Sequence, residues 1–293
     1  MGSLYESSNI TKLNVQGSTI QICTVRRPGF SGSKNLRLLM LHGNPSHLGH
    51  FESNIEFLRR YGEVALFDLP SFGRSPDVDS PLSLEFFAKV AVAYLDSMGW
   101  MSDVDVIGHS HGGAVAQTLA AHHPDRIRSV ILLGTMGYPA HLSMRLAMLP
   151  VIERLTFAIA KHAQKPASKR IASIFARLEA RISFAPDLPP LGFVEQELAV
   201  VVARPEIQRN SIRANDGNPT LQLIEQAARI RAPVMFIHGK QDRLIPIKNA
   251  QNIFDIVVKR SPKNRFAGVE GGHMVHMSRP EIVHEALASW MSL

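Results

Sequence analysis

Five short apolar runs, each followed by glycine or a turn residue, constrain the fold more than any other feature of the chain. They are RLLMLHG at 37–43, VALFDLP at 64–70, VDVIGHS at 104–110, VILLGT at 130–135 and APVMFIHG at 232–239. Continuous apolarity of this kind is typical of strands that are buried on both faces. Helix-like segments of suitable length separate the runs. This alternation predicts an α/β fold with a doubly wound, mostly parallel sheet.

Two segments depart from the alternation. TKLNVQ and TIQICTVRR flank Gly17-Ser18 and predict a hairpin at one edge of the sheet. After Thr135 the alternation stops, and it resumes near Ala232 after a stretch of helix formers interrupted by prolines. We therefore expect an α/β core domain of residues 1–136 and 219–293, with a helical cap inserted at 137–218. Eleven Lys and Arg against seven acidic residues make this cap basic.

Composition favours a globular protein in a reducing compartment. Apolar residues make up 45% of the chain and charged residues 19%, which supplies a packed interior. The single cysteine, Cys23, cannot form an internal disulfide, and no signal peptide or membrane-spanning run is recognisable. We expect a cytoplasmic protein without stable membrane insertion. The net charge of +7 comes from scattered Lys and Arg, so we expect solvated surface charge and no nucleic-acid partner.

The most informative motif is the segment GHSHGG at 108–113, which follows the apolar run VDVI and precedes the helix-like AVAQTLAAHH. This is the strand, turn and helix context in which a GxSxG motif exposes a serine nucleophile. Such a turn is strained, and glycine at the positions two before and two after Ser110 relieves the crowding. The helix dipole favours the negative charge that develops during acyl transfer. A GxSxG motif alone is common, so a plain glycine-rich turn is the alternative.

A serine nucleophile needs a base and an acid that orients the base. Among thirteen histidines, His273 is favoured because it follows Gly271-Gly272 near the C-terminus, in the chain order serine, acid, histidine. His276 is the main competitor, but it lacks the preceding glycines. The predicted acid is Asp242 in HGKQDRLIP, after the run APVMFI. We expect Asp68, the main alternative carboxylate, to brace a turn by hydrogen bonds.

Acyl transfer also needs two donors for the oxyanion. The backbone N–H groups of His111, directly after the nucleophile, and of Asn44, in the loop HGNP at 42–45, fill these places. The proline of this loop has no N–H to offer. Asn44 and the His111 ring are also candidate substrate-binding residues. So are Met144 and Met148, which belong to an apolar group that would roof a hydrophobic pocket or pack within the cap itself.

These features, in this order, resemble the α/β-hydrolase family from about Arg37 to the C-terminus. The HGNP loop is similar to that of haloalkane dehalogenases, where the asparagine side chain helps to bind the leaving halide. Those enzymes, and the related epoxide hydrolases, use an aspartate nucleophile. Ser110 occupies that position here, so the resemblance implies an acyl-enzyme. HSHGG also occurs in cofactor-free dioxygenases of this fold, which leaves non-hydrolytic chemistry as an alternative.

Two positions depart from the family pattern. Ser71 stands in LPSFGRS where a glycine is frequent, and Ser278-Arg279-Pro280 stands where an acidic residue often precedes the proline. Neither position belongs to the predicted triad.

We expect a serine esterase that cleaves a carboxylic ester of a small or medium apolar substrate through an acyl-enzyme, with no metal and no organic cofactor. A thioesterase and a carbon–carbon bond hydrolase share the triad and remain alternatives. A small-molecule receptor-like module with slow or no turnover is the alternative of another class, although an intact Ser110, Asp242 and His273 argue against full degeneration. The basic cap favours an anionic substrate, such as an acyl group on a phosphopantetheine carrier. The sequence fixes neither the substrate nor the oligomeric state.

Overall fold

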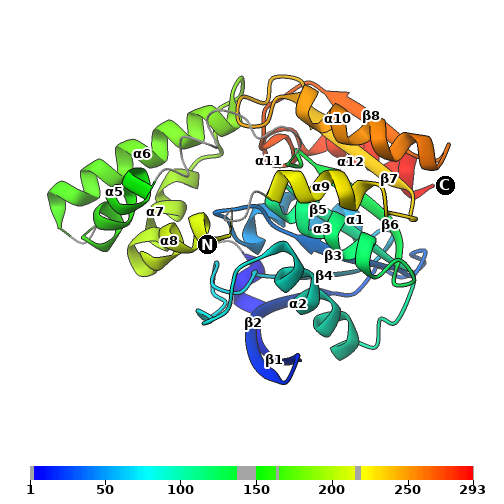
Figure 1. The fold of residues 1–293 in the computed structure, drawn as a ribbon. Coiled ribbons are helices and arrows are strands. Elements are labelled where there is room, and N and C mark those ends of the chain that lie inside the picture. The colour runs from blue at the N-terminus through cyan, green and yellow to red at the C-terminus, as the bar shows by residue number, and fades with distance from the viewer. Residues whose placement is uncertain (1–2, 137–149, 163–164, 215–218, 293) are drawn as a thin grey trace.

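A computed structural model describes residues 3–136, 150–162, 165–214 and 219–292 (Figure 1). Its centre is an eight-stranded sheet in the order β1-β2-β4-β3-β5-β6-β7-β8. The strands are β1 (Asn9–Val15), β2 (Ser18–Arg27), β3 (Leu36–Leu41), β4 (Gly62–Phe67), β5 (Val104–His109), β6 (Ile127–Leu133), β7 (Val234–Gly239) and β8 (Arg265–Val269). The pairs β1–β2 and β2–β4 are antiparallel, and the other five pairs are parallel. The mostly parallel sheet and its edge hairpin are thus confirmed.

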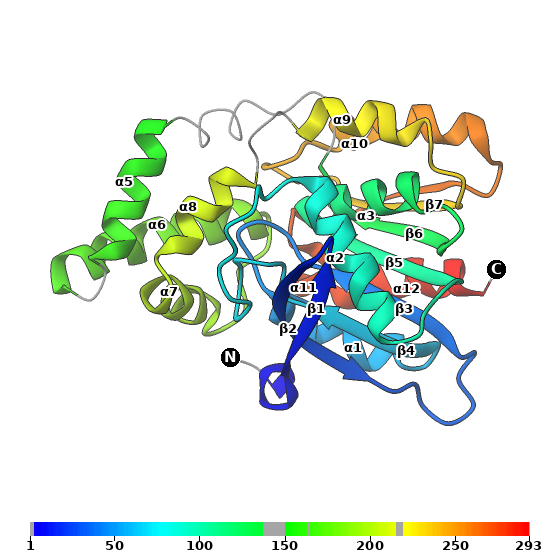
Figure 2. The ribbon, with the colours of Figure 1, turned by 60° about the horizontal axis from the view of Figure 1, so that its bottom comes forward.

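Helices pack on both faces of the sheet (Figure 2), and each face has its own hydrophobic cluster. Successive side chains of a strand point to opposite faces. Accordingly, Leu39 and Leu41 of β3 join one cluster, while Leu38 and Met40 join the other. The first cluster includes residues of α2 (Leu84–Ser97), α3 (His111–His122), α9 (Pro219–Ala227) and α10 (Ile247–Val257). The second includes residues of η2 (Leu48–Phe51), α1 (Glu52–Leu58), α11 (Val275–Ser278) and α12 (Pro280–Met291). Burial on both faces explains why the strands read as continuous apolar runs.

Four of the described helices between β6 and β7 stand beside the sheet rather than on either face (Figures 1 and 2). We call them the cap helices: α5 (Pro150–Lys161), α6 (Pro166–Phe184), α7 (Phe193–Ala203) and α8 (Glu206–Arg213). Ion pairs join this region to the core, with Arg279 Nη2 2.6 Å from Asp187 Oδ1 and Arg204 Nη2 3.2 Å from Asp77 Oδ1. The division into core and cap domains stays a prediction, because the segments around both boundaries, 137–149 and 215–218, lie outside the described residues.

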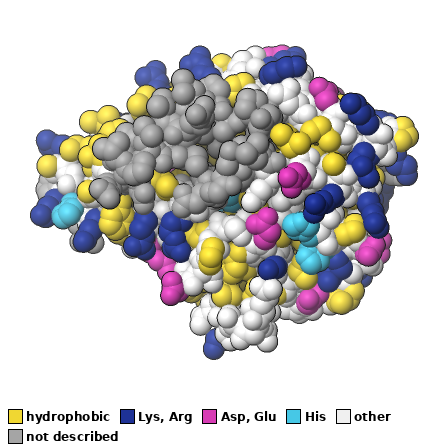
Figure 3. Space-filling model, in the orientation of Figure 1, with side chains coloured by type: hydrophobic (Ala, Val, Ile, Leu, Met, Phe, Trp, Pro, Cys, Tyr) yellow, Lys and Arg dark blue, Asp and Glu magenta, His cyan; other side chains and the backbone are white. Residues whose placement is uncertain are grey.

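The surface carries its positive charge in dispersed form. On the face drawn in Figure 3, Lys and Arg side chains occur at many separate places around the rim, on the cap helices as well as on the core. This distribution agrees with the scatter along the sequence. Among the described helices, none has the length and apolarity that crossing a membrane requires.

Candidate active site

Ser110 lies between β5 and α3, at the point where the chain reverses from strand to helix. Its φ of 52° and ψ of −117° are unfavourable for a residue with a side chain. A Cβ on Gly108 would overlap the carbonyl oxygen of Gly112, and a Cβ on Gly112 would overlap that of Leu41 at the end of β3. The backbone therefore packs too closely for any residue but glycine at both positions, which is the structural reason for the GxSxG pattern.

The Asp242 carboxylate orients the imidazole of His273. Its Oδ2 lies 2.8 Å from His273 Nδ1, and its Oδ1 accepts hydrogen bonds from the backbone N–H groups of Leu244 at 2.9 Å and Ile245 at 2.8 Å. Burial raises the pKa of Asp242, but the charge and hydrogen bonds of His273 and His238 outweigh it, so the pKa lies well below its usual range. An ionised carboxylate only accepts hydrogen bonds, so His273 carries a proton on Nδ1 and has its lone pair on Nε2.

Two further histidines lie near His273: His109 packs against it, and His276 packs against His109. Burial lowers the pKa of His109 well below its usual value, and the Nε2 of this neutral ring lies 3.2 Å from the His273 carbonyl oxygen, to which it donates. His276 is also fully buried, packed against His109 and Phe51. Neither of its ring nitrogens has a hydrogen-bond partner among the described residues. The structure thus places His273, and not its competitor His276, on Asp242.

The loop after β3 passes directly over the elbow. A Cβ on Gly43 would lie 3.1 Å from Ser110 Cβ. His42 holds this loop, because its Nδ1 donates to the Gly43 carbonyl at 2.7 Å and its Nε2 accepts from Leu69 N at 2.9 Å. Burial lowers the pKa of His42 to about 3, so the ring is neutral with one defined tautomer. The backbone N–H groups of Asn44 and His111 remain the predicted oxyanion donors.

The side chains of these two residues are held by the C-terminal end of α8. Asn44 Nδ2 donates to the Ser211 carbonyl at 2.7 Å, and His111 Nε2 lies 3.2 Å from the Ala214 carbonyl. Burial lowers the pKa of His111 to about 4, so the neutral ring donates this bond. Carbonyls near the C-terminal end of a helix can accept hydrogen bonds from groups outside the helix. The expectation that the His111 ring binds substrate stays a prediction: in this structure the ring packs against Phe87, and His111 is not among the described residues that line the cavity.

A cavity of about 370 Å³ lies between the core and the cap helices, and both Ser110 and His273 line it. Asn44 also lines it, whereas Met144 and Met148 fall outside the described residues. Most of the cap contribution is apolar, including Ile159, Phe175, Leu178, Leu198 and Val201. Among the described lining residues there is no Lys or Arg, and the charged ones are Glu179 and Glu197. The described basic side chains of the cap therefore do not line this cavity.

Sequence reasoning missed the polar side of this cavity. Glu197 Oε1 on α7 lies 2.9 Å from His50 Nε2 and 3.1 Å from His47 Nε2, and all three residues line the cavity. Burial raises the pKa of Glu197, but the two imidazoles outweigh it and hold the pKa well below its usual range. The Glu179 side chain is exposed and lines the cavity. Desolvation by the surrounding protein, together with the charge of Glu197, raises its pKa to about 7. The pair H-x-x-H was visible at 47–50, but its acidic partner is distant in sequence.

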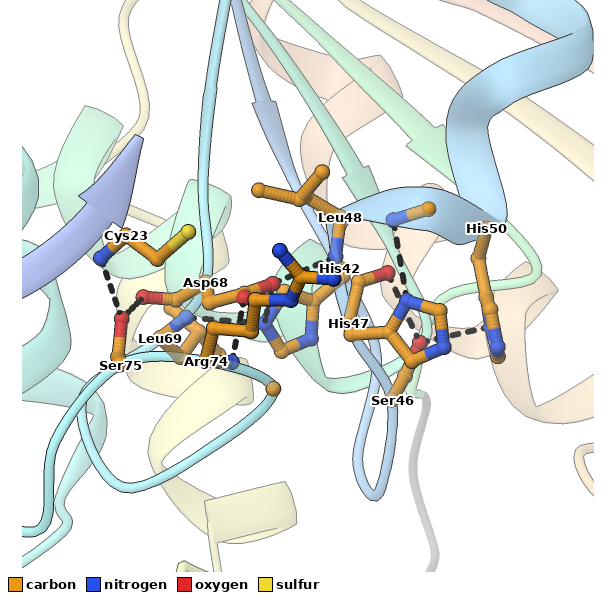
Figure 4. A network of polar contacts seen from close by, with 12 residues as sticks. Cys23, His42, Ser46, His47, Leu48, His50, Asp68, Leu69, Arg74 and Ser75 are labelled. Carbon is orange, nitrogen blue, oxygen red and sulfur yellow. Dashed lines mark hydrogen bonds and ion pairs between the residues drawn. The ribbon is translucent and has the colours of Figure 1, made fainter. Parts of the chain in front are cut away.

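Asp68 braces the turn after β4, as expected. Its Oδ1 accepts from Leu48 N at 2.7 Å and its Oδ2 from Arg74 N at 2.7 Å (Figure 4). The hydroxyl of Tyr5 donates to Oδ2 at 2.8 Å. Ser75 Oγ donates to the Asp68 carbonyl at 2.5 Å and accepts from Cys23 N. This fully buried carboxylate fixes the loops on which the HGNP segment and the two cavity histidines lie.

The two departures from the family pattern have visible accommodations. Ser71 has a φ of 72°, the left-handed region that favours glycine, and its Oγ accepts from Val78 N at 3.1 Å. Arg279 forms an ion pair with Asp187 in the segment between α6 and α7. The hydrogen bond and charge of this guanidinium hold the pKa of Asp187 below its usual value.

Comparison with known proteins agrees with this architecture. The family model described as alpha/beta hydrolase fold matches residues 37–280. The chain is 22% identical over 264 residues to the polyketide synthase ThaQ of Burkholderia thailandensis, covering 89% of this chain but only 12% of that protein. It is 25% identical over 225 residues to a 2-hydroxymuconate semialdehyde hydrolase of Pseudomonas putida, covering 72% of each chain.

A solved structure of a probable hydrolytic enzyme from Pseudomonas aeruginosa superposes with a TM-score of 0.77 at 18% identity, covering 97% of this chain and 93% of that one. At this identity the likeness shows a shared fold alone. The family match, which extends over most of the chain and includes the elbow, Asp242 and His273, shows more. The chain belongs to the α/β-hydrolase fold family.

Proposed function

We propose that the protein is a serine hydrolase that cleaves a carboxylic ester of a small or medium apolar substrate through an acyl-enzyme. One observation carries the proposal: His273, held by a buried ionised Asp242, lines the same largely apolar cavity as the strained Ser110. Nucleophile, base and orienting acid are the three roles that acyl transfer requires of side chains. Hydrolase relatives in the family support the general reaction class.

In the acylation step, Ser110 Oγ attacks the ester carbonyl carbon and transfers its proton to His273 Nε2. The imidazolium that forms is stabilised by the Asp242 carboxylate on Nδ1. The carbonyl oxygen takes up the negative charge and accepts hydrogen bonds from the backbone N–H groups of Asn44 and His111. When the tetrahedral intermediate collapses, the C–O bond to the alcohol breaks and His273 returns its proton to the leaving alkoxide.

In the deacylation step, water takes the place of the alcohol. His273 Nε2 removes a proton from the water as its oxygen attacks the acyl carbon, and the second intermediate forms in the same oxyanion site. Collapse breaks the bond to Ser110 Oγ, which regains the proton from His273. The net reaction is ester plus water to acid plus alcohol, and every group of the protein returns to its starting state.

The cavity limits the substrate. A volume of about 370 Å³ with mainly apolar cap side chains suits a short or medium acyl group. Because Glu179 and Glu197 are the charged lining residues and no described lining residue is Lys or Arg, an anionic group is disfavoured inside the cavity. An acyl chain delivered by a phosphopantetheine carrier would have to leave its phosphate outside. The charge of the cavity therefore gives no preference for thioesters of such a carrier over carboxylic esters. Only the relative rates of hydrolysis distinguish the two substrate classes.

A fluorophosphonate probe tests the nucleophile. Wild-type protein should be labelled with one probe per chain, Ser110→Ala should not be labelled, and His273→Ala should react far more slowly. Ser31→Ala, which alters an exposed serine, is the matched control and should be labelled like wild type. A folded wild-type protein that stays unlabelled, or an unchanged rate in Ser110→Ala, contradicts the proposal.

The leaving group is tested by comparing kcat/KM for p-nitrophenyl esters and acyl thioesters with the same acyl chain. An ester preference that peaks at short or medium chains supports the proposal. A ranking dominated by thioesters makes the protein a thioesterase. Tight ligand binding without turnover of either series places it with the receptor-like modules.

A further inference from the structure

Outside the triad, one cluster of side chains has the composition of a metal site. We call it the His–Glu cluster: His47, His50 and Glu197. His47 caps the 3₁₀ helix η2 and His50 lies within it, and residues three apart in a 3₁₀ helix lie on the same side. Glu197 comes from the cap helix α7. Their potential ligand atoms all lie within 4.8 Å of one another.

We propose that the His–Glu cluster binds one divalent transition-metal ion, with Zn²⁺ as the best chemical match. Two imidazole nitrogens and one carboxylate oxygen form a donor set that Zn²⁺ favours, and a three-ligand set leaves a coordination position open. Tetrahedral coordination at about 2.0–2.2 Å places ligand atoms about 3.3–3.6 Å apart. The Glu197 oxygen now lies 2.9 and 3.1 Å from the two nitrogens, so the oxygen and each nitrogen need to separate by only a few tenths of an ångström, and all the potential ligand atoms already lie within 4.8 Å of one another.

The backbone that carries the two histidines is already fixed. Asp68 accepts a hydrogen bond from Leu48 N, between the two histidines, at 2.7 Å. Figure 4 shows His47 and His50 side by side at the end of the Asp68 network. The centroids of their rings are 4.6 Å apart. A site built on such a supported loop loses little conformational entropy when an ion arrives.

The two histidines differ in what occupies their other nitrogen. His50 Nδ1 lies 2.7 Å from Ser46 Oγ, a hydroxyl that can accept a hydrogen bond from a protonated Nδ1 and in that state supports metal ligation through Nε2. His47 Nδ1 accepts from Gly49 N at 3.1 Å, so its proton sits on Nε2. Ligation by His47 Nε2 therefore requires a change of tautomer and the loss of the Gly49 bond. His50 and Glu197 should consequently contribute more to affinity than His47.

An ion at this place would join the cap to the core inside the cavity that contains Ser110. Glu197 belongs to the cap, the histidines belong to the core, and all three line the cavity. The open coordination position is thus available to water or to an oxygen of a bound ligand. None of the three proposed metal ligands belongs to the predicted triad of Ser110, His273 and Asp242. The proposed ion therefore has no assigned part in acyl transfer.

Isothermal titration of tag-free, chelator-stripped protein with ZnCl₂ tests the proposal. One Zn²⁺ per chain is expected to bind. Loss of an outer-shell partner alone typically weakens metal binding roughly 10- to 100-fold, so His50→Ala and the near-isosteric Glu197→Gln should each weaken it at least about tenfold. His47→Ala should weaken it less. Substitution with Co²⁺ should give a visible absorption spectrum typical of four-coordinate nitrogen and oxygen ligands.

His122→Ala, which removes an exposed histidine of α3, is the matched control and should bind Zn²⁺ like wild type. Thermal melts of every variant show whether the fold is retained. Glu197→Gln keeps the shape of the side chain, so a folded variant is available even if His50→Ala unfolds. The proposal fails if wild type binds no Zn²⁺, or if Glu197→Gln and His50→Ala bind it as wild type does. Either result would leave the cluster a hydrogen-bonded contact between cap and core.

Discussion

Replacing Asp242 with asparagine tests the tautomer assigned to His273. Oδ1 of Asp242 accepts hydrogen bonds from the N–H groups of both Leu244 and Ile245. In Asp242→Asn the amide oxygen should keep this place, since the amide nitrogen would set donor against donor. The NH₂ group then faces His273 Nδ1 and donates to it. His273 must therefore carry its proton on Nε2, the atom that has to take the proton from Ser110.

The wrong tautomer in a Ser-His-Asp triad typically lowers kcat by about 10⁴-fold, which corresponds to about 5.4 kcal/mol of activation free energy. The loss should appear in kcat rather than KM, because Asp242 is not among the described residues that line the cavity. Two of its hydrogen bonds are retained, so the free energy of unfolding should fall by no more than about 1–3 kcal/mol.

The assay is steady-state hydrolysis of the best p-nitrophenyl ester, with a thermal melt of each variant. Asp255→Asn, which neutralises an exposed carboxylate on α10, is the matched control and should leave kcat unchanged. A folded Asp242→Asn variant whose kcat stays within about tenfold of wild type would refute the orientation argument, because a correct His273 tautomer would then not depend on this carboxylate.

Three further changes have defined expectations. Gly108→Ala should lower the free energy of unfolding in urea by about 1–3 kcal/mol or more, since its Cβ overlaps the Gly112 carbonyl; wild-type stability would contradict the elbow geometry. His276→Leu should leave kcat/KM within about threefold and leave stability unchanged or raise it by about 1 kcal/mol, because two unpartnered buried nitrogens are removed. A large loss of activity would return His276 to the catalytic machinery. The pKa of Glu179 is raised from 4.5 to about 7, so the folded state keeps a proton that the unfolded chain releases. Its contribution to stability is present below about pH 4.5 and is lost as the pH rises through about 7. Melting temperatures of Glu179→Gln should therefore decline less than those of wild type between about pH 5 and 8; parallel curves would contradict the raised pKa.

Strand burial made the fold predictable, and strand ends together with chain order indicated the candidate triad, which stays a prediction. Each parallel strand reads as an apolar run because both of its faces are covered, and Ser110, Asp242 and His273 follow the carboxyl ends of β5, β7 and β8. Parallel strands bring these ends to one edge of the sheet, so short sequence distances from a strand end translate into closeness in space. The glycines two residues before and two after Ser110 indicated close backbone packing. In the structure a Cβ at either position would overlap a backbone carbonyl oxygen.

The other features of the site could not be predicted, because they depend on contacts between helices and loops that are distant in the sequence. The periodicity of apolar residues does not indicate how such elements pack. Glu197 lies 147 residues from His50, and only the packing of α7 against the η2 loop brings them together. The His111 ring was expected to bind substrate, but the end of α8 supplies an acceptor that no sequence pattern indicated. The basic composition of the cap suggested an anionic substrate, yet composition does not say which side chains face the cavity.

The hydrogen bonds from Asn44 and His111 to the end of α8 have a consequence for how the specificity of this fold could change in evolution. The acceptors are main-chain carbonyls of Ser211 and Ala214, so any sequence that ends a helix at this point supplies them. Side chains of α8 can therefore drift without disturbing the groups beside the nucleophile. Exchanging the whole cap for one of different length would remove both acceptors, because both carbonyls lie at the end of α8. Substitutions of α8 side chains should therefore disturb Asn44 and His111 less than replacement of the whole cap.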